Sequence, residues 1–279
     1  MLLFVEFFKN IINSRAILKH FVKRDLKVKY RNSIIGFFWT FLKPFFIFLI
    51  INFVFSLFLK FEVKTKYSYF LLISLFPWLF FQGSITDATY SIINTSSLIK
   101  KVGFPREIVP ISFCISHFIH FLLSYFVITS IILILSKHIS FKIIFVPFIL
   151  FLLFLFSIGI GLILSSLNVF FRDIGHSLEI ILMLMFYATP IFYPVNLALN
   201  SMEAFHWHFI FKYIYLLNPM LFIVLSLRMS LLYPQNSFIE LPKIVFLKYA
   251  CVEIFLIIFI FFIGIYVFKK LEPAMLDVI

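Results

Sequence analysis

Few side chains in this 279-residue sequence could do chemistry, and most of them stand within long apolar runs. His117 and His120 are three residues apart. A helix would place their imidazoles on one face, where they could begin a metal site or pass a proton. Asp87 and Glu253 are carboxylates within two other apolar runs. A titratable group in such surroundings is costly to bury and is therefore a functional candidate.

Each of these residues also has a structural explanation. No third ligand accompanies the two histidines in the sequence pattern. Asp87 lies near one end of its run, where hydration or helix capping accounts for a carboxylate. Glu253 lies deeper in its run, where it would face either a cavity or a helix interface.

Enzymatic and nucleotide-binding motifs are missing from the sequence. It has no evident nucleophile–base pair and no phosphate-binding loop of the form G-x-x-x-x-G-K-[ST]. Gly159 and Gly161 stand inside an apolar run, which favours close helix packing. Cys114 and Cys251 also lie in apolar runs and predict neither a disulfide framework nor a metal site. We therefore predict that the chain is not an enzyme and binds no cofactor or metal of its own.

The composition is that of an integral membrane protein. Hydrophobic residues make up 63% of the chain and charged residues 13%, whereas a soluble domain has about 45–50% apolar and about 25% charged residues. The formal net charge of +12 does not indicate nucleic-acid binding, because the basic residues cluster beside apolar runs. Such residues set membrane topology and contact anionic lipids.

Residues 1–35 are predicted to form a cytoplasmic segment that lies on the bilayer surface. Apolar residues recur there at helical spacing, with basic residues at other positions. The apolar positions are Phe4, Phe7, Phe8, Ile11 and Ile12. A basic amphipathic helix at the interface is the expected structure. The basic residues follow the first apolar stretch, so the segment does not read as a cleavable signal peptide.

Residues 36–279 are predicted to form a single transmembrane domain. A helix needs about 20 apolar residues to cross the hydrocarbon core. Six runs reach or approach this length: about 36–59, 68–92, 108–135, 143–166, 176–193 and 243–268. The segment 194–242 contains four prolines and many aromatic residues. We expect a pair of short re-entrant or interfacial helices there.

The basic residues predict that both ends of the chain are cytoplasmic. Residues 1–35 contain eight Lys or Arg residues, and the loop 93–107 contains three more. Loops rich in Lys and Arg stay on the cytoplasmic side, and the first span usually dominates the orientation. The segment 194–242 then faces the extracytoplasmic side.

A short polar and basic island separates the second and third runs. It extends from Asn94 to Pro110 and contains Lys100, Lys101 and Arg106. An ordinary cytoplasmic loop could have this composition. So could a loop on which a second protein docks.

Six segments match one family of membrane proteins in their residue types and in their order along the chain. They are 25–44 (DLKVKYRNSIIGFFWTFLKP), 76–81 (FPWLFF), 98–106 (LIKKVGFPR), 168–175 (NVFFRDIG), 189–194 (TPIFYP) and 217–220 (LNPM). With them the sequence resembles the permease subunits of type-2 ABC exporters, in the branch that moves O-antigen, capsule and teichoic-acid polymers. Lys43 departs from the family pattern, and His206 and His208 have no place in it.

The resemblance implies an all-α polytopic fold. Its parts would be six transmembrane helices, an N-terminal amphipathic helix, a cytoplasmic coupling helix and extracytoplasmic re-entrant helices. The chain would act in the cytoplasmic (inner) membrane as two copies with two copies of an ABC ATPase, which would bind ATP and Mg. The substrate implied is a lipid-linked polysaccharide, which would cross to the outer leaflet.

The resemblance also assigns residues to sites. In the coupling helix, the expected apolar anchors on the ATPase are Leu98, Ile99, Val102 and Phe104. The expected charged rim around them is Lys100, Lys101 and Arg106.

Further candidates lie at the two ends of the implied pore. Those for a cytoplasmic gate or ATPase contact are Tyr30, Arg31, Arg172 and Asp173. Those for the channel or its exit are Tyr187, Tyr193, Trp207, Arg228 and Glu253. The pair at 172–173 could instead cap neighbouring helices, and the aromatic residues could form an interfacial belt.

Two other functions remain open at this point. A type-2 ABC permease could export a small hydrophobic drug or a lipid instead of a polymer. A membrane-embedded enzyme of glycan or lipid assembly would have a similar composition, although the missing acid–base pair counts against it.

Overall fold

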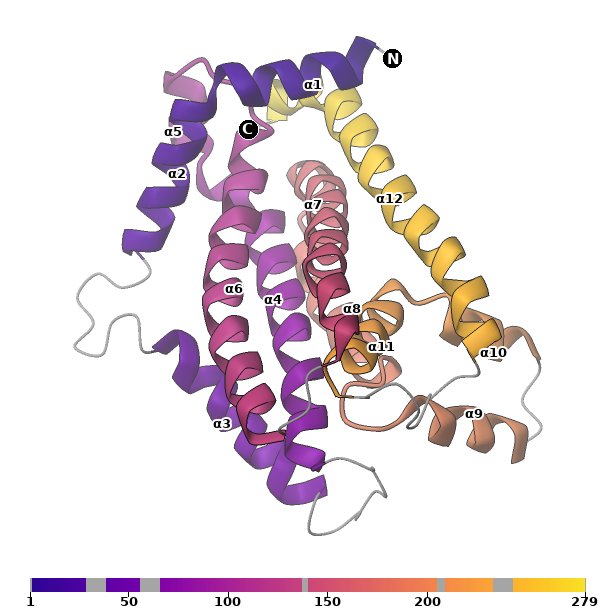
Figure 1. The fold of residues 1–279 in the computed structure, drawn as a ribbon. Coiled ribbons are helices and arrows are strands. Elements are labelled where there is room, and N and C mark those ends of the chain that lie inside the picture. Colours follow the sequence, from indigo (N-terminus) through magenta and orange to yellow (C-terminus); the bar gives the residue numbers. More distant parts are fainter. Residues whose placement is uncertain are drawn as a thin grey trace.

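The computed structural model describes residues 2–28, 39–55, 66–136, 140–204, 209–232 and 243–278. Within these ranges all regular structure is helical, which confirms the all-α prediction (Figure 1). The order is α1 (Leu2–Asn13), α2 (Arg15–Val28), α3 (Trp39–Val54), α4 (Tyr67–Asn94), α5 (Ser96–Lys101), α6 (Ile108–Ser136), the 3-10 helix η3 (Phe141–Phe145), α7 (Val146–Phe170), α8 (Asp173–Ala188), α9 (Val195–Ala204), α10 (Phe209–Leu216), α11 (Pro219–Leu231) and α12 (Lys243–Val278).

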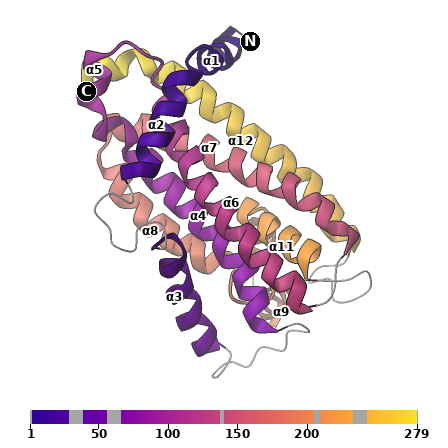
Figure 2. The same ribbon diagram turned by 60° about the vertical axis from the view of Figure 1, so that its left-hand side comes forward.

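The long helices form a bundle with two distinct ends. α4, α6 and α7 pack against one another, and α12 packs along α7. α1, α5 and the C-terminal part of α12 meet at one end of the bundle, which we call the α5 end (Figure 1). α9 lies at the other end, the α9 end. α3 stands at the edge of the bundle beside α4 (Figure 2).

The N-terminal segment differs from the single amphipathic helix that was predicted. The chain changes direction at Ser14, so that α1 lies across the α5 end and α2 runs down beside α6 (Figure 1). The predicted apolar stripe also divides in two. Phe7 is buried against the bundle, whereas Phe8 and Ile12 are exposed. The inner positions therefore attach α1 to the protein, and the outer positions remain exposed.

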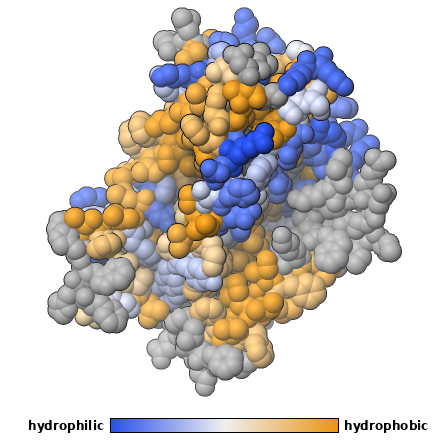
Figure 3. Space-filling view, turned by 180° about the vertical axis from the view of Figure 1, so that it is seen from behind, coloured by the Kyte–Doolittle hydropathy of each residue, from blue (hydrophilic) through white to orange (hydrophobic). Residues whose placement is uncertain are grey.

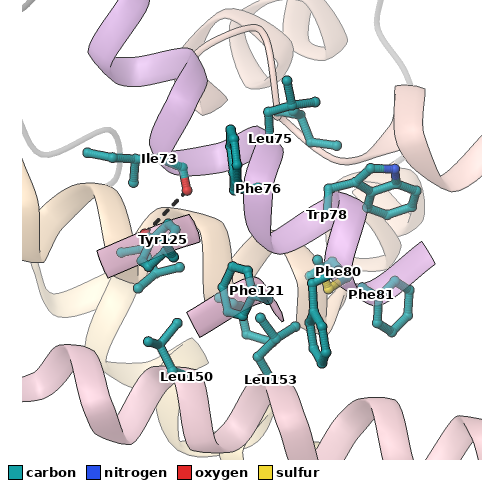
Figure 4. Close-up of a cluster of buried hydrophobic side chains, with 14 of the residues drawn as sticks. Ile73, Leu75, Phe76, Trp78, Phe80, Phe81, Phe121, Tyr125, Leu150 and Leu153 are labelled. Carbon is teal, nitrogen blue, oxygen red and sulfur yellow. Dashed lines mark hydrogen bonds between the residues drawn. The ribbon is translucent and has the colours of Figure 1, made fainter. Parts of the chain in front are cut away.

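Aromatic side chains from three helices fill the middle of the bundle. Phe81 of α4 stacks on Phe156 of α7 with ring centroids 5.0 Å apart. Phe80 of α4 stacks on Phe121 of α6, also at 5.0 Å. The labelled residues of Figure 4 show this cluster, in which the Tyr125 hydroxyl donates to the carbonyl of Ile73.

Glycine brings α7 and α12 into close contact. A Cβ on Gly159 would lie 2.8 Å from the Cα of Phe261, and a Cβ on Gly264 would collide with the backbone of Gly159. The two backbones can approach this closely only because both positions lack a side chain. The prediction of helix packing at Gly159 is thus confirmed. Gly161 faces other helices, at Ala88 and Cys114.

Four helices, or five if one bent pair is a single span, are long and apolar enough to cross a membrane within the described residues. Four predicted runs correspond to them: 68–92 to α4, 108–135 to α6, 143–166 to η3 with α7, and 243–268 to α12.

The two remaining predicted runs are shorter as helices. α3 and α8 have 16 residues each, within the described part of the chain. α8 begins earlier and ends earlier than the predicted run 176–193. α10 and α11 form the bent pair, with an angle of 61° between them.

Candidate functional site

The basic island folds into a short helix and a turn at the α5 end. α5 spans six residues, and the chain becomes extended at Val102. Lys100, Lys101 and Val102 are exposed, whereas Ile99 is buried. Helical geometry explains the division, because one face of so short a helix must hold it to the protein.

The apolar residues of this loop therefore differ in their contacts and in their exposure. Ile99 and, in part, Leu98 pack into the core cluster of the chain itself. Phe104 lies against Phe21 of α2, with ring centroids 5.4 Å apart. Of the four expected anchors, only Val102 is freely exposed in this conformation, at 48%. We call the exposed part of the predicted docking loop, Lys100, Lys101 and Val102, the docking surface after that prediction. It is smaller and more basic than the surface that the sequence predicted.

Arg106, assigned to the rim, faces inward as well. Its Nη1 donates to the backbone carbonyl of Glu272 on α12, at 2.7 Å. The next residue, Glu107, is fully buried, and its Oε1 lies 2.9 Å from the Nζ of Lys269. Asn10 of α1 donates to the same oxygen at 3.0 Å. The turn after the docking surface is thus attached to both α1 and α12.

The segment 168–175 forms a second built turn at the start of α8. Asn168 is fully buried, donates to the carbonyl of Thr89 and accepts from the backbone amide of Gly175, both at 3.1 Å. A Cβ on Gly175 would collide with the hydroxyl of Tyr90. The sequence predicted gate residues at Arg172 and Asp173 of this segment, whereas Asn168 and Gly175 position the turn.

The predicted gate residues of this turn lie at the surface. Arg172 and Asp173 are both exposed. Asp173 stands in the first turn of α8, where a carboxylate is favoured by the helix dipole. Tyr30 and Arg31, the other two gate candidates, lie outside the described residues.

α8 carries two kinds of exposed surface. His176, Ser177 and Glu179 are exposed in its first half, and Leu184 and Tyr187 are among the exposed residues of its second half. In Figure 3, the view from behind, hydrophilic side chains gather around the middle and toward the upper right, with apolar areas at the upper left and below. Exposed polar side chains such as those of α8 are costly to place against lipid.

The chain between α8 and α9 is not helical, and side chains satisfy its backbone. Arg228 of α11 is fully buried and donates to the carbonyls of Pro190 and Ile191. Its Nε donates to the hydroxyl of Ser74 at 2.6 Å, and its guanidinium lies over the ring of Phe70. Irregular backbone at membrane depth requires such internal partners.

The remaining exit candidates have different surroundings. Tyr187 is 57% exposed, and Tyr193 donates to its carbonyl at 3.0 Å. Arg228 and Glu253 are both fully buried, so neither lines an open surface in this structure. Glu253 has no hydrogen-bond partner for either carboxyl oxygen within the described residues. Trp207, and with it His206 and His208, lies outside the described part of the chain.

Asp87 and His117 form a polar pair between α4 and α6. The Nε2 of His117 lies 2.5 Å from the Oδ2 of Asp87, and its ring packs on Gly83. Asp87 remains 49% exposed. His120 is buried. In the described ranges no three His, Cys, Asp or Glu side chains are placed to hold a metal ion.

Asp25 of α2 lies near this pair. It accepts two hydrogen bonds from Arg24, at 2.9 and 3.1 Å. Burial raises the pKa of the Asp25 carboxyl, and the neighbouring Arg24 opposes that rise.

Two residues that form a buried ion pair were not singled out from the sequence. Glu107 and Lys269 stand in different segments of the sequence and meet only in the fold. One feature of the sequence could have drawn attention to them: each is a charged residue at the end of a long apolar run. That signal indicates an interfacial location but does not identify the partner.

Comparisons with known proteins show the family of the chain. Residues 17–232 match the ABC-2 type transporter family. Two proteins of Klebsiella pneumoniae, each named O-antigen export system permease protein RfbA, are 34% identical over 206 residues, which is 74% of this chain and 76% of theirs. A protein of the same name from Myxococcus xanthus is 28% identical over 211 residues, covering 72% and 81% respectively. The chain therefore belongs to the ABC-2 type transporter family and is a multi-pass membrane permease rather than an enzyme.

Proposed function

We propose that this chain is the membrane subunit of an exporter that moves a lipid-linked polysaccharide of the O-antigen type. The observation that carries the proposal is the match, over most of the chain, to permeases named for O-antigen export. A separate ABC ATPase supplies the ATP hydrolysis, as the family implies. The polymer crosses the cytoplasmic membrane from the inner to the outer leaflet.

The proposed topology has six spans with both ends in the cytoplasm. α3 and α8 add to the four long helices, and the basic residues of 1–35 and 93–107 favour a cytoplasmic α5 end. The bent pair α10–α11 is then re-entrant from the extracytoplasmic side. A 16-residue helix spans about 24 Å, so α8 crosses the core only together with the irregular segment that follows it.

The conduit is proposed to lie where α8 faces a second copy of the chain. A polysaccharide needs a hydrated path, and the exposed polar half of α8 supports one at that face. Exposed aromatic residues such as Tyr187 follow toward the α9 end. Sugar rings stack on aromatic faces, so these residues are suited to guide the polymer outward.

The docking surface is proposed to bind the ATPase. Its two lysines steer association, and Val102 is the one exposed apolar group that could be desolvated at the centre of a contact. The test is the triple variant Lys100→Glu, Lys101→Glu and Val102→Asp in cells that lack the native permease but produce its ATPase. Removing an interface centre costs about 2 kcal/mol, or about 30-fold in affinity.

Two measurements follow in this experiment: co-purification of the ATPase, and surface glycan labelled by periodate oxidation and a membrane-impermeant hydrazide. We expect both to fall while the amount of permease in the membrane stays at the parent level. Lys248→Glu, a charge reversal near the other end of the bundle, is the control and should change neither. If the triple variant binds its ATPase and exports glycan as the parent does, this surface is not the docking site.

A further inference from the structure

A buried ionic cluster joins the docking turn to the last helix. Lys269 of α12 is 3% exposed, and its Nζ lies 2.9 Å from both the Oε1 of Glu107 and the Oε2 of Glu272. The Oε1 of Glu6 lies farther away, at 3.7 Å. Arg106 adds a hydrogen bond to the backbone of Glu272. Arg106 and Glu107, the last two residues before α6, therefore both bind α12.

The same cluster reaches the N-terminal helix. Asn10 of α1 donates to the oxygen of Glu107 that Lys269 also contacts. Phe4 of α1 meets Phe262 of α12 edge to face, with ring centroids 5.4 Å apart. α1, α6 and α12 are thus attached to one buried carboxylate at the α5 end.

The cluster is also incompletely satisfied. The second oxygen of Glu107, Oε2, is buried without a hydrogen-bond partner within the described residues. A buried ionic group in this condition contributes less to stability than an apolar contact of the same size would. What the cluster provides is a fixed geometry between the docking turn and α12, through the contacts of Lys269 and Arg106.

We infer that Lys269 is a positioning residue that ties the docking turn to α12, so that movement of the ATPase reaches α12 as well as α6. α12 meets α7 at the close glycine contact, and α7 leads directly into the turn before α8. Displacement at the docking surface would then reach the proposed conduit through α12 and α7. The inference rests on the proposed docking function of this loop.

The test is Lys269→Met in the complete complex of permease and ATPase. Three quantities are measured: co-purification of the ATPase, ATP hydrolysis, and periodate-labelled surface glycan. We expect assembly and hydrolysis within about twofold of the parent and glycan export lowered at least fivefold. Lys270→Met is the matched control, because this neighbouring lysine is exposed and outside the cluster. It should export normally.

A charge exchange separates positioning from simple stability. Lys269→Glu combined with Glu107→Lys keeps the net charge and places a lysine between two carboxylates again. We expect this double variant to recover at least half of the export that Lys269→Met loses. If Lys269→Met fails to reach the membrane, the double variant alone tests the inference. An assembled complex in which export is restored supports it. An assembled complex without export, or the absence of an assembled complex, overturns it.

A distance measurement gives a readout other than transport. Nitroxide labels on Ser97→Cys and Ala274→Cys, both exposed positions, would report on the docking helix and the end of α12 in a Cys251→Ser background. In the parent complex ATP should leave their separation unchanged, because the two elements move together. In Lys269→Met, ATP should broaden or shift the distribution.

The outcomes also separate this inference from the docking proposal. Normal export by Lys269→Met, or a label distance that ATP changes in the parent, overturns the ionic link while leaving the docking surface intact. If the docking-surface triple variant still binds its ATPase, the docking proposal fails first, and the label distances then test the link alone.

Discussion

At the scale of residues, the charged groups that matter most are the buried ones. The partners of Arg228 include two backbone carbonyls, a serine hydroxyl and an aromatic ring. The hydrogen bonds supply donors to buried backbone carbonyls and to a buried hydroxyl, and the ring packs against the guanidinium. The guanidinium fork can serve several acceptors at once, which an ammonium group cannot do in the same geometry.

Replacing Arg228 should release the irregular segment before α9. Arg228→Met leaves the carbonyls of Pro190 and Ile191 without their donor, and unsatisfied buried groups of this kind cost about 1–3 kcal/mol each. We expect a lower midpoint of thermal unfolding in detergent and faster proteolysis near residue 190. Arg172→Met removes an exposed arginine and should leave both unchanged. Equal behaviour of the two variants would contradict the role assigned to Arg228.

The loop residue Phe104 offers a second prediction at this scale. Because its ring packs on Phe21, Phe104→Ala should weaken the attachment of the docking turn to α2 rather than remove a contact with the ATPase. We expect affinity for the ATPase to fall by less than in the docking-surface triple variant. Titration of the purified permease with its ATPase would measure both. An equal or larger loss for Phe104→Ala would mean that this ring leaves Phe21 and enters the ATPase.

At the scale of elements, one helix crossing determines how closely α7 and α12 pack. Gly159→Ala places a methyl group 2.8 Å from backbone that cannot rotate away. Gly161→Ala meets only side chains, at 3.1 Å or more. Both substitutions gain up to about 1 kcal/mol of helix propensity. Overpacking at Gly159 should cost about 1–3 kcal/mol, so only that variant should lose stability.

Detergent unfolding of the two alanine variants measures this difference directly. The comparison is internal, since the substitution is the same and the positions are two residues apart on one helix. Gly103→Ala adds a surface control, because a Cβ there meets no heavy atom within 4 Å. A less stable Gly161→Ala protein beside an unaffected Gly159→Ala protein would refute the packing assigned to this crossing.

The sequence was sufficient to predict the long helices, but not the break between α1 and α2 or all of the helix ends. Apolar runs long enough to span a bilayer gave the positions of α4, α6, α7 and α12, because each run provides its own signal. The predicted run 176–193 extends past the end of α8 because most of its last residues are apolar, although Pro190 is a local sign of a helix end. α8 is followed instead by backbone whose carbonyls bind Arg228, a partner that no local pattern reveals.

Local and non-local signals also differ in the docking loop. Lys100 and Lys101 could be predicted as exposed because adjacent charges beside an apolar run need water. The inward direction of Ile99 and Phe104 depends on Phe21 and on the core cluster beneath α5, which come from other segments. The ion pair between Glu107 and Lys269 likewise could not be predicted, because its two residues are far apart in the sequence.

At the scale of the whole molecule, the arrangement of charge predicts an orientation. The α5 end gathers α1, the docking surface and the ionic cluster, whereas the α9 end has the bent pair α10–α11. Basic loops remain cytoplasmic because moving them across the membrane opposes the positive-inside bias of insertion. All proposals that involve an ATPase require the α5 end to be the cytoplasmic one.

Cysteine labelling tests that orientation. Cys114 is buried, so a Cys251→Ser background has no exposed thiol among the described residues. Ser201→Cys on α9 should react with a membrane-impermeant maleimide in intact cells or, if an outer membrane is present, in spheroplasts. Ser97→Cys beside the docking surface should react only after the cytoplasmic membrane is opened. Because both positions are exposed serines, a difference in labelling reports the side of the membrane. The opposite pattern would place the docking surface outside the cell, where no ATPase could reach it, and would end the proposed mechanism of coupling.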